Sequence, residues 1–181
     1  MTRLIFNGKA LRNADGVLSM PPIYNDWFLP TQAALATMRV ELHDYGLGNF
    51  TNGYYWASNE GSPSNGTTIS IFGGSGTSLP KGDIYNVRPI RKFTANNGTY
   101  NLRDTGPGGG LIFYILGTLH LESYTQDLDD SVWSNITNQS VGTTSTDIDD
   151  GDSNTQTIIN QPGHITSAAL LCTQLITYGD I

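Results

Sequence analysis

The densest group of potential metal ligands lies between residues 147 and 154, where the sequence reads Asp-Ile-Asp-Asp-Gly-Asp-Ser-Asn. Carboxylate and amide oxygens at such close spacing are the ligands that calcium-binding loops use. The helix–loop–helix calcium pattern fails, however, because Ile158 stands at the twelfth position, where a bidentate glutamate belongs. We therefore interpret the segment as a solvated acidic loop and expect no cofactor. Its weak candidate metal ligands are Asp147, Asp149, Asp150 and Asp152.

Residues that could carry out catalysis are scarce. Cys172 is the single cysteine, which excludes an intramolecular disulfide and a cysteine-based zinc site. No serine–histidine–acid set stands out, and His43, His120 and His164 are each interpreted as structural or solvated. The glycine run at residues 108–110 precedes an apolar stretch rather than opening a helix, so it is not a phosphate-binding loop. The sequence predicts that the protein is not an enzyme.

The charge balance argues against nucleic acid as a partner. Nine Lys and Arg residues face 16 Asp and Glu residues, and no basic stripe is present to displace counterions from a phosphate backbone. No apolar run approaches the roughly 20 residues of a membrane span, so we expect no membrane insertion. The apolar run at residues 4–6 is too short for the roughly 7–15 apolar residues of a signal peptide. This predicts either release by a route other than ordinary secretion or a trimmed chain.

Two helices are predicted from apolar residues that recur every three or four positions. The first is capped by Thr31 and ends before Gly46. Its buried face is Leu35, Met38, Leu42 and Tyr45. The second runs from about residue 167 to residue 176 and is capped by Thr166 or Ser167. Its buried face is Ala168, Leu171, Cys172 and Leu175, which makes the cysteine a small core side chain.

Strand patterns occupy much of residues 50–93 and return after residue 110. Residues 54–56, 67–72 and 85–93 are rich in aromatic and β-branched residues or alternate with a period of two. Pro89 has no N–H to donate, so it is expected at an edge or a bulge. Residues 94–110 are rich in Asn, Gly and Thr and predict a long surface connection. The apolar run at residues 111–115 predicts a central strand covered on both faces.

Several motifs together resemble one protein family. Residues 104–115 read DTGPGGGLIFYI, and residues 133–136 read WSNI. Residues 26–30 read DWFLP, followed by GNF at 48–50, YYWAS at 54–58 and VRPIRKF at 87–93. Over nearly everything beyond residue 22, these pieces resemble the Lcl C-terminal-type domains of bacterial adhesins and many phage proteins. The resemblance implies a fold similar to C-type lectins and formylglycine-generating enzymes, and the single cysteine disfavours the chemistry of the latter.

The order of the motifs differs from that family, because the pieces that normally come second stand first here. The resemblance therefore implies a circular permutant over residues 23–181, with residues 94–110 joining the former termini; a chain cut across two tandem copies is the alternative. We expect an α+β, C-type-lectin-like domain with two helices and a small twisted antiparallel sheet. Strands 87–93 and 111–115 should then be antiparallel neighbours in one sheet. Trp27 and Trp56 stand at family motif positions and are expected to be buried.

The resemblance also implies a ligand site. In lectin-like folds the loops between the later strands present a ligand surface on a rigid scaffold, and here that region is residues 58–66 with the turn at 73–83. Its polar side chains and nearby tyrosines suit hydrogen bonds to sugar hydroxyls and stacking on sugar rings. An ordinary polar loop is the alternative interpretation. The candidate ligand-binding residues are Ser58, Asn59, Glu60, Ser62, Ser64, Asn65, Tyr85 and Asn86.

Residues 1–22 form a head whose charge is opposite to that of the rest of the chain. Three of the nine Lys and Arg residues lie there, against a single acid, Asp15. Alternating apolar residues with paired turns favour adding a strand to a neighbour's sheet edge. This predicts an attachment arm that mediates assembly in a closed homo-oligomer or with a virion protein. A small edge hairpin of the main domain is the alternative. The arm's candidate residues are Arg3, Leu4, Phe6, Lys9 and Arg12.

Together these features predict a non-enzymatic structural protein of a phage virion, in a decoration or fibre on the head or tail, that adheres to host-surface glycans. The expected location is the virion, and the expected partners are other virion proteins, sister subunits and a host glycan. The alternative is a bacterial cell-surface or secreted glycan-binding adhesin.

Overall fold

The structure is a computed structural model, and it describes residues 21–142 and 144–179. The candidate arm residues Arg3, Leu4, Phe6, Lys9 and Arg12 lie outside the described residues. In the part that is described, strands dominate and the helices are three α-helices and one short 3-10 helix. The helices are α1 (Gln32–Glu41), η1 (His43–Tyr45), α2 (Gly151–Ile159) and α3 (Ala168–Gln174).

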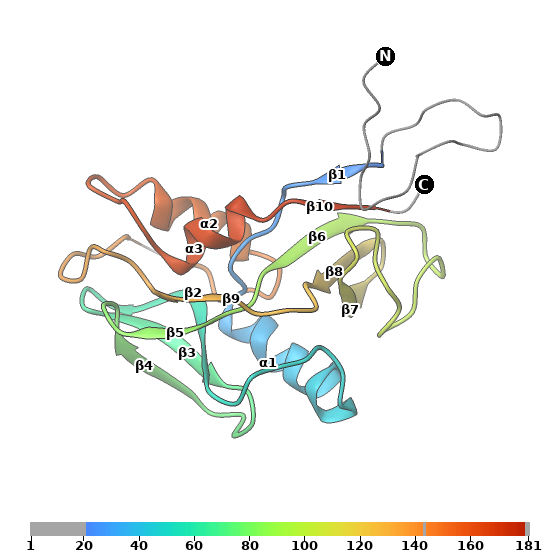
Figure 1. Cartoon of the computed structure of the whole chain (residues 1–181), viewed down its shortest axis with the longest axis horizontal. Helices are drawn as coiled ribbons and strands as arrows, with labels where there is room; N and C mark the ends of the chain where they lie inside the picture. Colours follow the sequence, from blue (N-terminus) through green and yellow to red (C-terminus); the bar gives the residue numbers. More distant parts are fainter. Residues whose placement is uncertain (1–20, 143, 180–181) are drawn as a thin grey trace, which may run out of the picture.

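The strands form three sheets (Figure 1). A five-stranded sheet has the order β4 (Gly76–Pro80), β3 (Asn65–Ser70), β2 (Tyr54–Ser62), β5 (Ile84–Val87) and β9 (Leu128–Val132). A three-stranded sheet has the order β6 (Ile90–Thr94), β8 (Leu119–Ser123) and β7 (Leu111–Leu116). A short ribbon pairs β1 (Ile23–Tyr24) with β10 (Thr177–Tyr178), near the two ends of the described chain.

The first helix forms where its cap and apolar spacing predict. The Thr31 side chain accepts a hydrogen bond from the backbone N–H of Ala34, which satisfies one of the free donors of the first turn. Leu35, Met38 and Leu42 are fully buried, as predicted. Tyr45 is 61% exposed, so its predicted place on the buried face is wrong. The helix has already ended at Glu41, and η1 turns this tyrosine outward.

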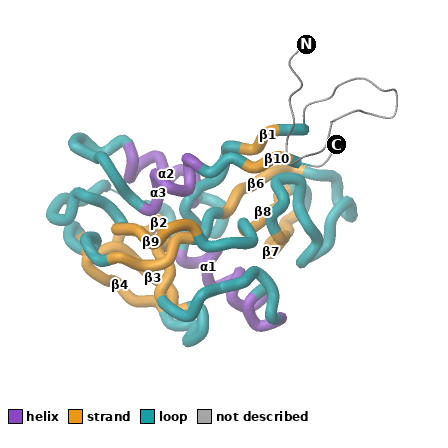
Figure 2. Tube along the Cα trace, in the orientation of Figure 1, coloured by secondary structure: helices purple, strands orange, loops and turns teal. Residues whose placement is uncertain are grey.

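The five-stranded sheet is covered on both faces, as Figure 2 shows for the helices around it. Tyr55 and Ala57 of β2 belong to a core that α1 shares with the three-stranded sheet. Trp56 points to the opposite face, into a core that contains residues of α2 and α3. Successive strand residues face opposite sides, so one strand supplies both cores. The predicted burial of Trp27 and Trp56 is confirmed, at 1% and 0% exposure.

The expected architecture of two helices with a small antiparallel sheet is wrong, although an α+β fold is broadly compatible with the structure. A third helix, α2, occupies part of the segment that we interpreted as a solvated acidic loop. The strands form three sheets rather than one, and β2 pairs with β5 in parallel. Asn154 and Thr155 of α2 are buried and hydrogen-bonded, and such polar residues do not produce the apolar spacing by which helices are recognised.

The predicted direct pairing of strands 87–93 and 111–115 is also wrong. Val87 ends β5 in the five-stranded sheet, whereas β6 begins at Ile90 in the three-stranded sheet, on the other side of Pro89. Strands β6 and β7 share that sheet, but β8 lies between them and is antiparallel to both. Strand β7 is therefore at an edge of its sheet and not central.

The glycine-rich segment before β7 packs on a buried carboxylate. Glu122 is fully buried and accepts hydrogen bonds from the backbone N–H groups of Gly108 and Gly110 and from Arg91. A Cβ at Gly106, Gly108 or Gly110 would lie within 3.1 Å of a Glu122 carboxylate oxygen, which explains why the segment is so rich in glycine. Burial would lower the pKa of Arg91, but its hydrogen bonds to Asp26 and Glu122 outweigh burial and raise it.

Candidate functional site

The predicted ligand loop at residues 58–66 is mostly strand. Strand β2 continues through Ser62 and β3 begins at Asn65, so the connection between them is two residues long. Ser58 and Asn59 are buried. The Asn59 side chain accepts from the backbone N–H of Gln32 at 2.6 Å and donates to the Ser145 carbonyl at 2.6 Å, and Ser58 Oγ accepts from Asn154. Their polar atoms are engaged within the chain, which corrects their placement in an exposed ligand loop.

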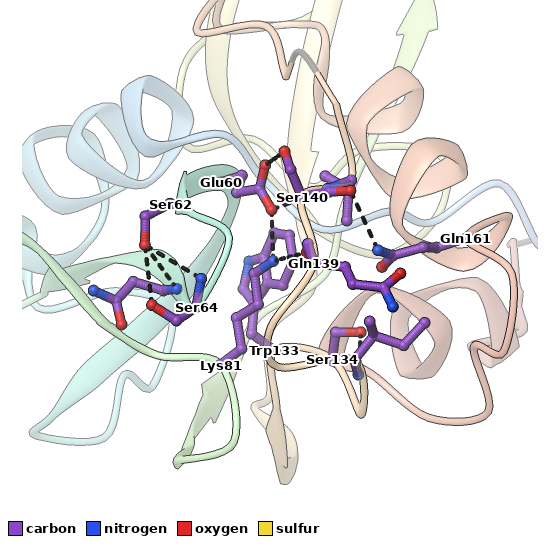
Figure 3. A network of polar contacts seen from close by, with 12 residues as sticks. Glu60, Ser62, Ser64, Lys81, Trp133, Ser134, Gln139, Ser140 and Gln161 are labelled. Atoms are coloured by element: carbon purple, nitrogen blue, oxygen red, sulfur yellow. Dashed lines mark hydrogen bonds and ion pairs between the residues drawn. The ribbon is translucent and has the colours of Figure 1, made fainter.

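Glu60 is the acceptor at the centre of a buried network (Figure 3). Its carboxylate pairs with the Lys81 ammonium at 2.5 Å and accepts from Val141 N at 3.0 Å and Ser140 Oγ at 2.6 Å. Lys81 is fully buried, donates a second hydrogen bond to the Gln139 carbonyl at 2.9 Å, and lies 4.8 Å from the centre of the Trp133 ring. The pair therefore fastens the long connection after β9 to the sheet and is not free to bind a ligand.

The other residues of the predicted loop are more accessible. Ser64 is exposed, and Ser62 and Asn65 are half-buried. Ser62 Oγ accepts from the backbone N–H groups of Ser64 and Asn65, so it shapes the tight turn between β2 and β3. These three residues are separated from Tyr85 and Asn86, which lie on β5, on the opposite side of β2 from β3.

The acidic segment does not gather its carboxylates. Asp150 accepts from Ser145 Oγ at 2.6 Å, whereas Asp152 pairs with Lys92 at 2.9 Å. Asp147 and Asp149 have no side-chain hydrogen bond or ion pair within the described part of the chain. Among the described residues, no group of three or more His, Cys, Asp or Glu side chains is placed to hold a metal ion.

Two neighbouring tyrosines form the best candidate for a ligand-binding surface. Tyr54 begins β2 and Tyr85 lies on β5, and the register of the two strands places them side by side. Their ring centres are 5.8 Å apart in an edge-to-face arrangement, and Tyr85 contacts the buried Trp56 ring in the same way at 5.0 Å. Tyr54 is 40% exposed and Tyr85 is half-buried. The buried tryptophan therefore supports Tyr85, and Tyr85 in turn contacts the more exposed Tyr54.

Asn86 holds Tyr54 in place. Its side-chain amide donates to the Tyr54 carbonyl at 2.9 Å, which ties the start of β2 to β5. Gly53 leaves room for this contact, because a Cβ there would lie 2.7 Å from the Asn86 amide nitrogen. Asn86 is therefore a positioning residue in this structure.

One carboxylate contacts the tyrosine pair, and two others lie on the neighbouring strand β9. The Tyr85 hydroxyl donates to Asp83 at 3.4 Å. On the next strand, Tyr85 is opposite Ser131 and Val87 is opposite Leu128, so two residues of β9 face the single residue Asn86. This is a β-bulge, a feature that re-aims side chains and is common near functional sites. The two bulge residues, Asp129 and Asp130, are both exposed.

We refer to Tyr54, Tyr85 and Asp83 as the tyrosine surface. It carries one carboxylate, and the two cations next to β5 do not neutralise it. Lys81 is paired with Glu60, and Arg88 is paired with Asp127 at 2.6 Å, and both side chains are fully buried. Burial, together with the Asp83 carboxylate, raises the pKa of Tyr85, so its hydroxyl stays protonated and able to donate. The surface offers aromatic rings, hydroxyl groups and acceptor oxygens under a negative potential.

Comparison with known proteins gives no match: no protein-family model, no curated protein and no solved structure is similar to the chain. The resemblance to Lcl C-terminal-type domains therefore stays a prediction. None of the described helices has the length and apolar character needed to cross a membrane.

Of the tyrosine surface, Tyr85 was among the candidates, Asp83 fell only within the predicted turn, and Tyr54 was in no set of candidates. Tyr54 stood in a motif that we interpreted as a short aromatic strand, and its local sequence did not show that its ring is exposed while Tyr55 and Trp56 are buried. Its proximity to Tyr85 depends on the pairing of β2 with β5 and is not visible in the sequence.

Proposed function

We propose that this protein is a non-enzymatic component of a phage virion that binds a glycan through the tyrosine surface. The observation that supports glycan binding is the exposed Tyr54 ring, held against Tyr85, whose hydroxyl donates to Asp83. Aromatic faces pack against the apolar C–H faces of sugar rings, and carboxylates accept hydrogen bonds from sugar hydroxyls. The virion assignment is supported only by the motif resemblance.

The charges of the tyrosine surface define the class of glycan. The Asp83 carboxylate, with the nearby Lys81 and Arg88 buried and paired, repels anionic sugars such as sialic acid or sulfated chains. A neutral glycan avoids this repulsion and uses the carboxylate as an acceptor. The expected ligand is therefore an uncharged oligosaccharide with at least one sugar ring that stacks on Tyr54.

A glycan array tests this proposal. The full chain should bind a subset of neutral glycans, and Tyr54→Ala should lose at least about tenfold in affinity for them, corresponding to about 1.4 kcal/mol. Tyr45→Ala is the matched control, because Tyr45 is 61% exposed on η1, outside the tyrosine surface. Binding that is absent for all glycans, or that Tyr54→Ala leaves unchanged, would contradict the proposal.

The virion location needs a separate experiment. Mass spectrometry of purified particles from a host that carries the gene should recover the chain in fixed ratio to the major capsid protein. Recovery only from the cell surface or the culture medium, without particles, would contradict the virion assignment and favour a cellular adhesin.

A further inference from the structure

A hollow that residues of several elements line lies outside the tyrosine surface. It is a groove of about 500 Å³, within the range of small-molecule sites. Its walls come from the segment that leads into α1, from β6 and from the helices α2 and α3. The buried side chains of Trp27 and Phe28 contribute apolar lining.

Two partly exposed ion pairs contribute polar groups to the groove. Asp26 accepts two hydrogen bonds from Arg91, at 2.7 and 3.0 Å, and the Asp26 side chain is still 51% exposed. Lys92 pairs with Asp152 at 2.9 Å, and their side chains are 35% and 42% exposed. Each carboxylate that lines the groove is thus paired with a cation, although Arg91 also pairs with Glu122, which does not line the groove.

The groove retains unused hydrogen-bonding capacity. The amide side chains of Asn25 and Gln156 line it, are exposed, and have no hydrogen-bond partner among the described residues. Lys92 uses two of its three N–H groups, on Asp152 and on the Asp149 carbonyl at 3.2 Å. Each amide supplies two donor hydrogens and one acceptor oxygen. Free donors and free acceptors therefore line one hollow, and they come from three separate elements.

From this arrangement we infer that the groove is a second binding site, which takes a neutral, hydroxyl-rich small molecule such as a single sugar ring. Hydroxyl groups both donate and accept, so they match a lining that presents both kinds of partner. No charged side chain in the lining is left unpaired to attract an anion or a cation. This inference does not rest on the tyrosine surface.

The test is a ¹H–¹⁵N nuclear magnetic resonance titration of the full chain with D-glucose, D-galactose, D-mannose and D-xylose, each to about 50 mM, so that sites with a Kd of about 1 mM are saturated. At least one sugar should shift the signals of Asn25, Lys92 and Gln156 together. The double variant Asn25→Ala, Gln156→Ala should weaken that binding at least tenfold. Both side chains are exposed and unpartnered, so the variant should keep the thermal unfolding midpoint of the wild type.

Two controls separate this site from others. Asn138→Ala removes an exposed amide that does not line the groove and should leave sugar binding unchanged. Tyr54→Ala should also leave it unchanged, which distinguishes failure of this inference from failure of the proposed function. The inference is overturned if no neutral sugar shifts the groove signals. It is equally overturned if glucose 6-phosphate or protonated glucosamine binds there more tightly than glucose, because charge compensation would then not select the ligand.

Discussion

Removal of the Lys81 ammonium is expected to cost a large part of the free energy of unfolding. The group is fully buried, and its partners are the Glu60 carboxylate at 2.5 Å, the Gln139 carbonyl at 2.9 Å and the face of Trp133 at 4.8 Å. Lys81→Met keeps the apolar stem but leaves Glu60, whose side chain is 8% exposed, as an uncompensated buried charge. Breaking a buried pair in this way costs about 3–5 kcal/mol.

Urea unfolding measures that loss. With a slope of about 2 kcal/mol per M, a loss of 4 kcal/mol lowers the midpoint by about 2 M. The double variant Lys81→Met, Glu60→Leu should cost less than the sum of the two single changes, because it leaves no buried charge without its partner. Arg39→Met, which breaks the partly exposed pair with Asp44, is the control and should cost less than about 1 kcal/mol. If Lys81→Met costs no more than Arg39→Met, the network around Glu60 does not hold the long connection in place and our reasoning is refuted.

Four further experiments test other parts of the structure. Trp56→Ala should cost about 3–5 kcal/mol in urea unfolding, because the ring is fully buried and its removal leaves a cavity; a cost below 1 kcal/mol would contradict its place in the core. Gly110→Ala should cost about 1–3 kcal/mol, since its Cβ would lie 2.6 Å from the Ser123 carbonyl oxygen, whereas Gly82→Ala, with its nearest neighbour at 3.5 Å, should be nearly neutral. Burial raises the pKa of Cys172, so its thiol should react with a disulfide reagent at pH 8 only after denaturation, and fast labelling of the folded protein would show an open core. Burial lowers the pKa of His164 from 6.5, so the unfolded chain binds more protons and the free energy of unfolding should fall as the pH drops below about 6.5. The stability of His164→Gln should fall less over the same pH range, and identical pH profiles for the two proteins would contradict this.

The helices and core strands whose signals are local could be predicted from the sequence. The cap of α1 is the predicted Thr31, and the cap of α3 is Ser167, one of the two predicted candidates, because a capping side chain bonds only three residues away. Helix α2 was missed because its buried residues Asn154 and Thr155 are polar and are satisfied by partners far along the chain. A polar residue that is hydrogen-bonded in the core is indistinguishable in sequence from one that faces water.

The same difficulty explains why Asn59 and Glu60 were predicted to bind a ligand although they are hydrogen-bonded within the chain. Asn59 and Glu60 are as polar as any binding residue, but their partners are Gln32, Ser145 and Lys81, which lie 21 to 86 residues away. Tyr85 and Asn86 were among the candidates, and the structure places them beside Tyr54 in one sheet. Tyr54 and Tyr85 come together through the pairing of β2 with β5, and strand register is set by contacts that no local pattern encodes.

The central claim is that Tyr54 binds a neutral glycan by stacking, and one set of affinities tests it most directly. Titration calorimetry of the best neutral ligand from the array should be run on the wild-type chain, Tyr54→Phe and Tyr54→Ala. We predict that Tyr54→Phe binds within about threefold of the wild type, because the ring is kept, and that Tyr54→Ala loses at least about tenfold. Equal affinities for all three proteins would contradict the claim, since the exposed ring would then make no contact with the sugar.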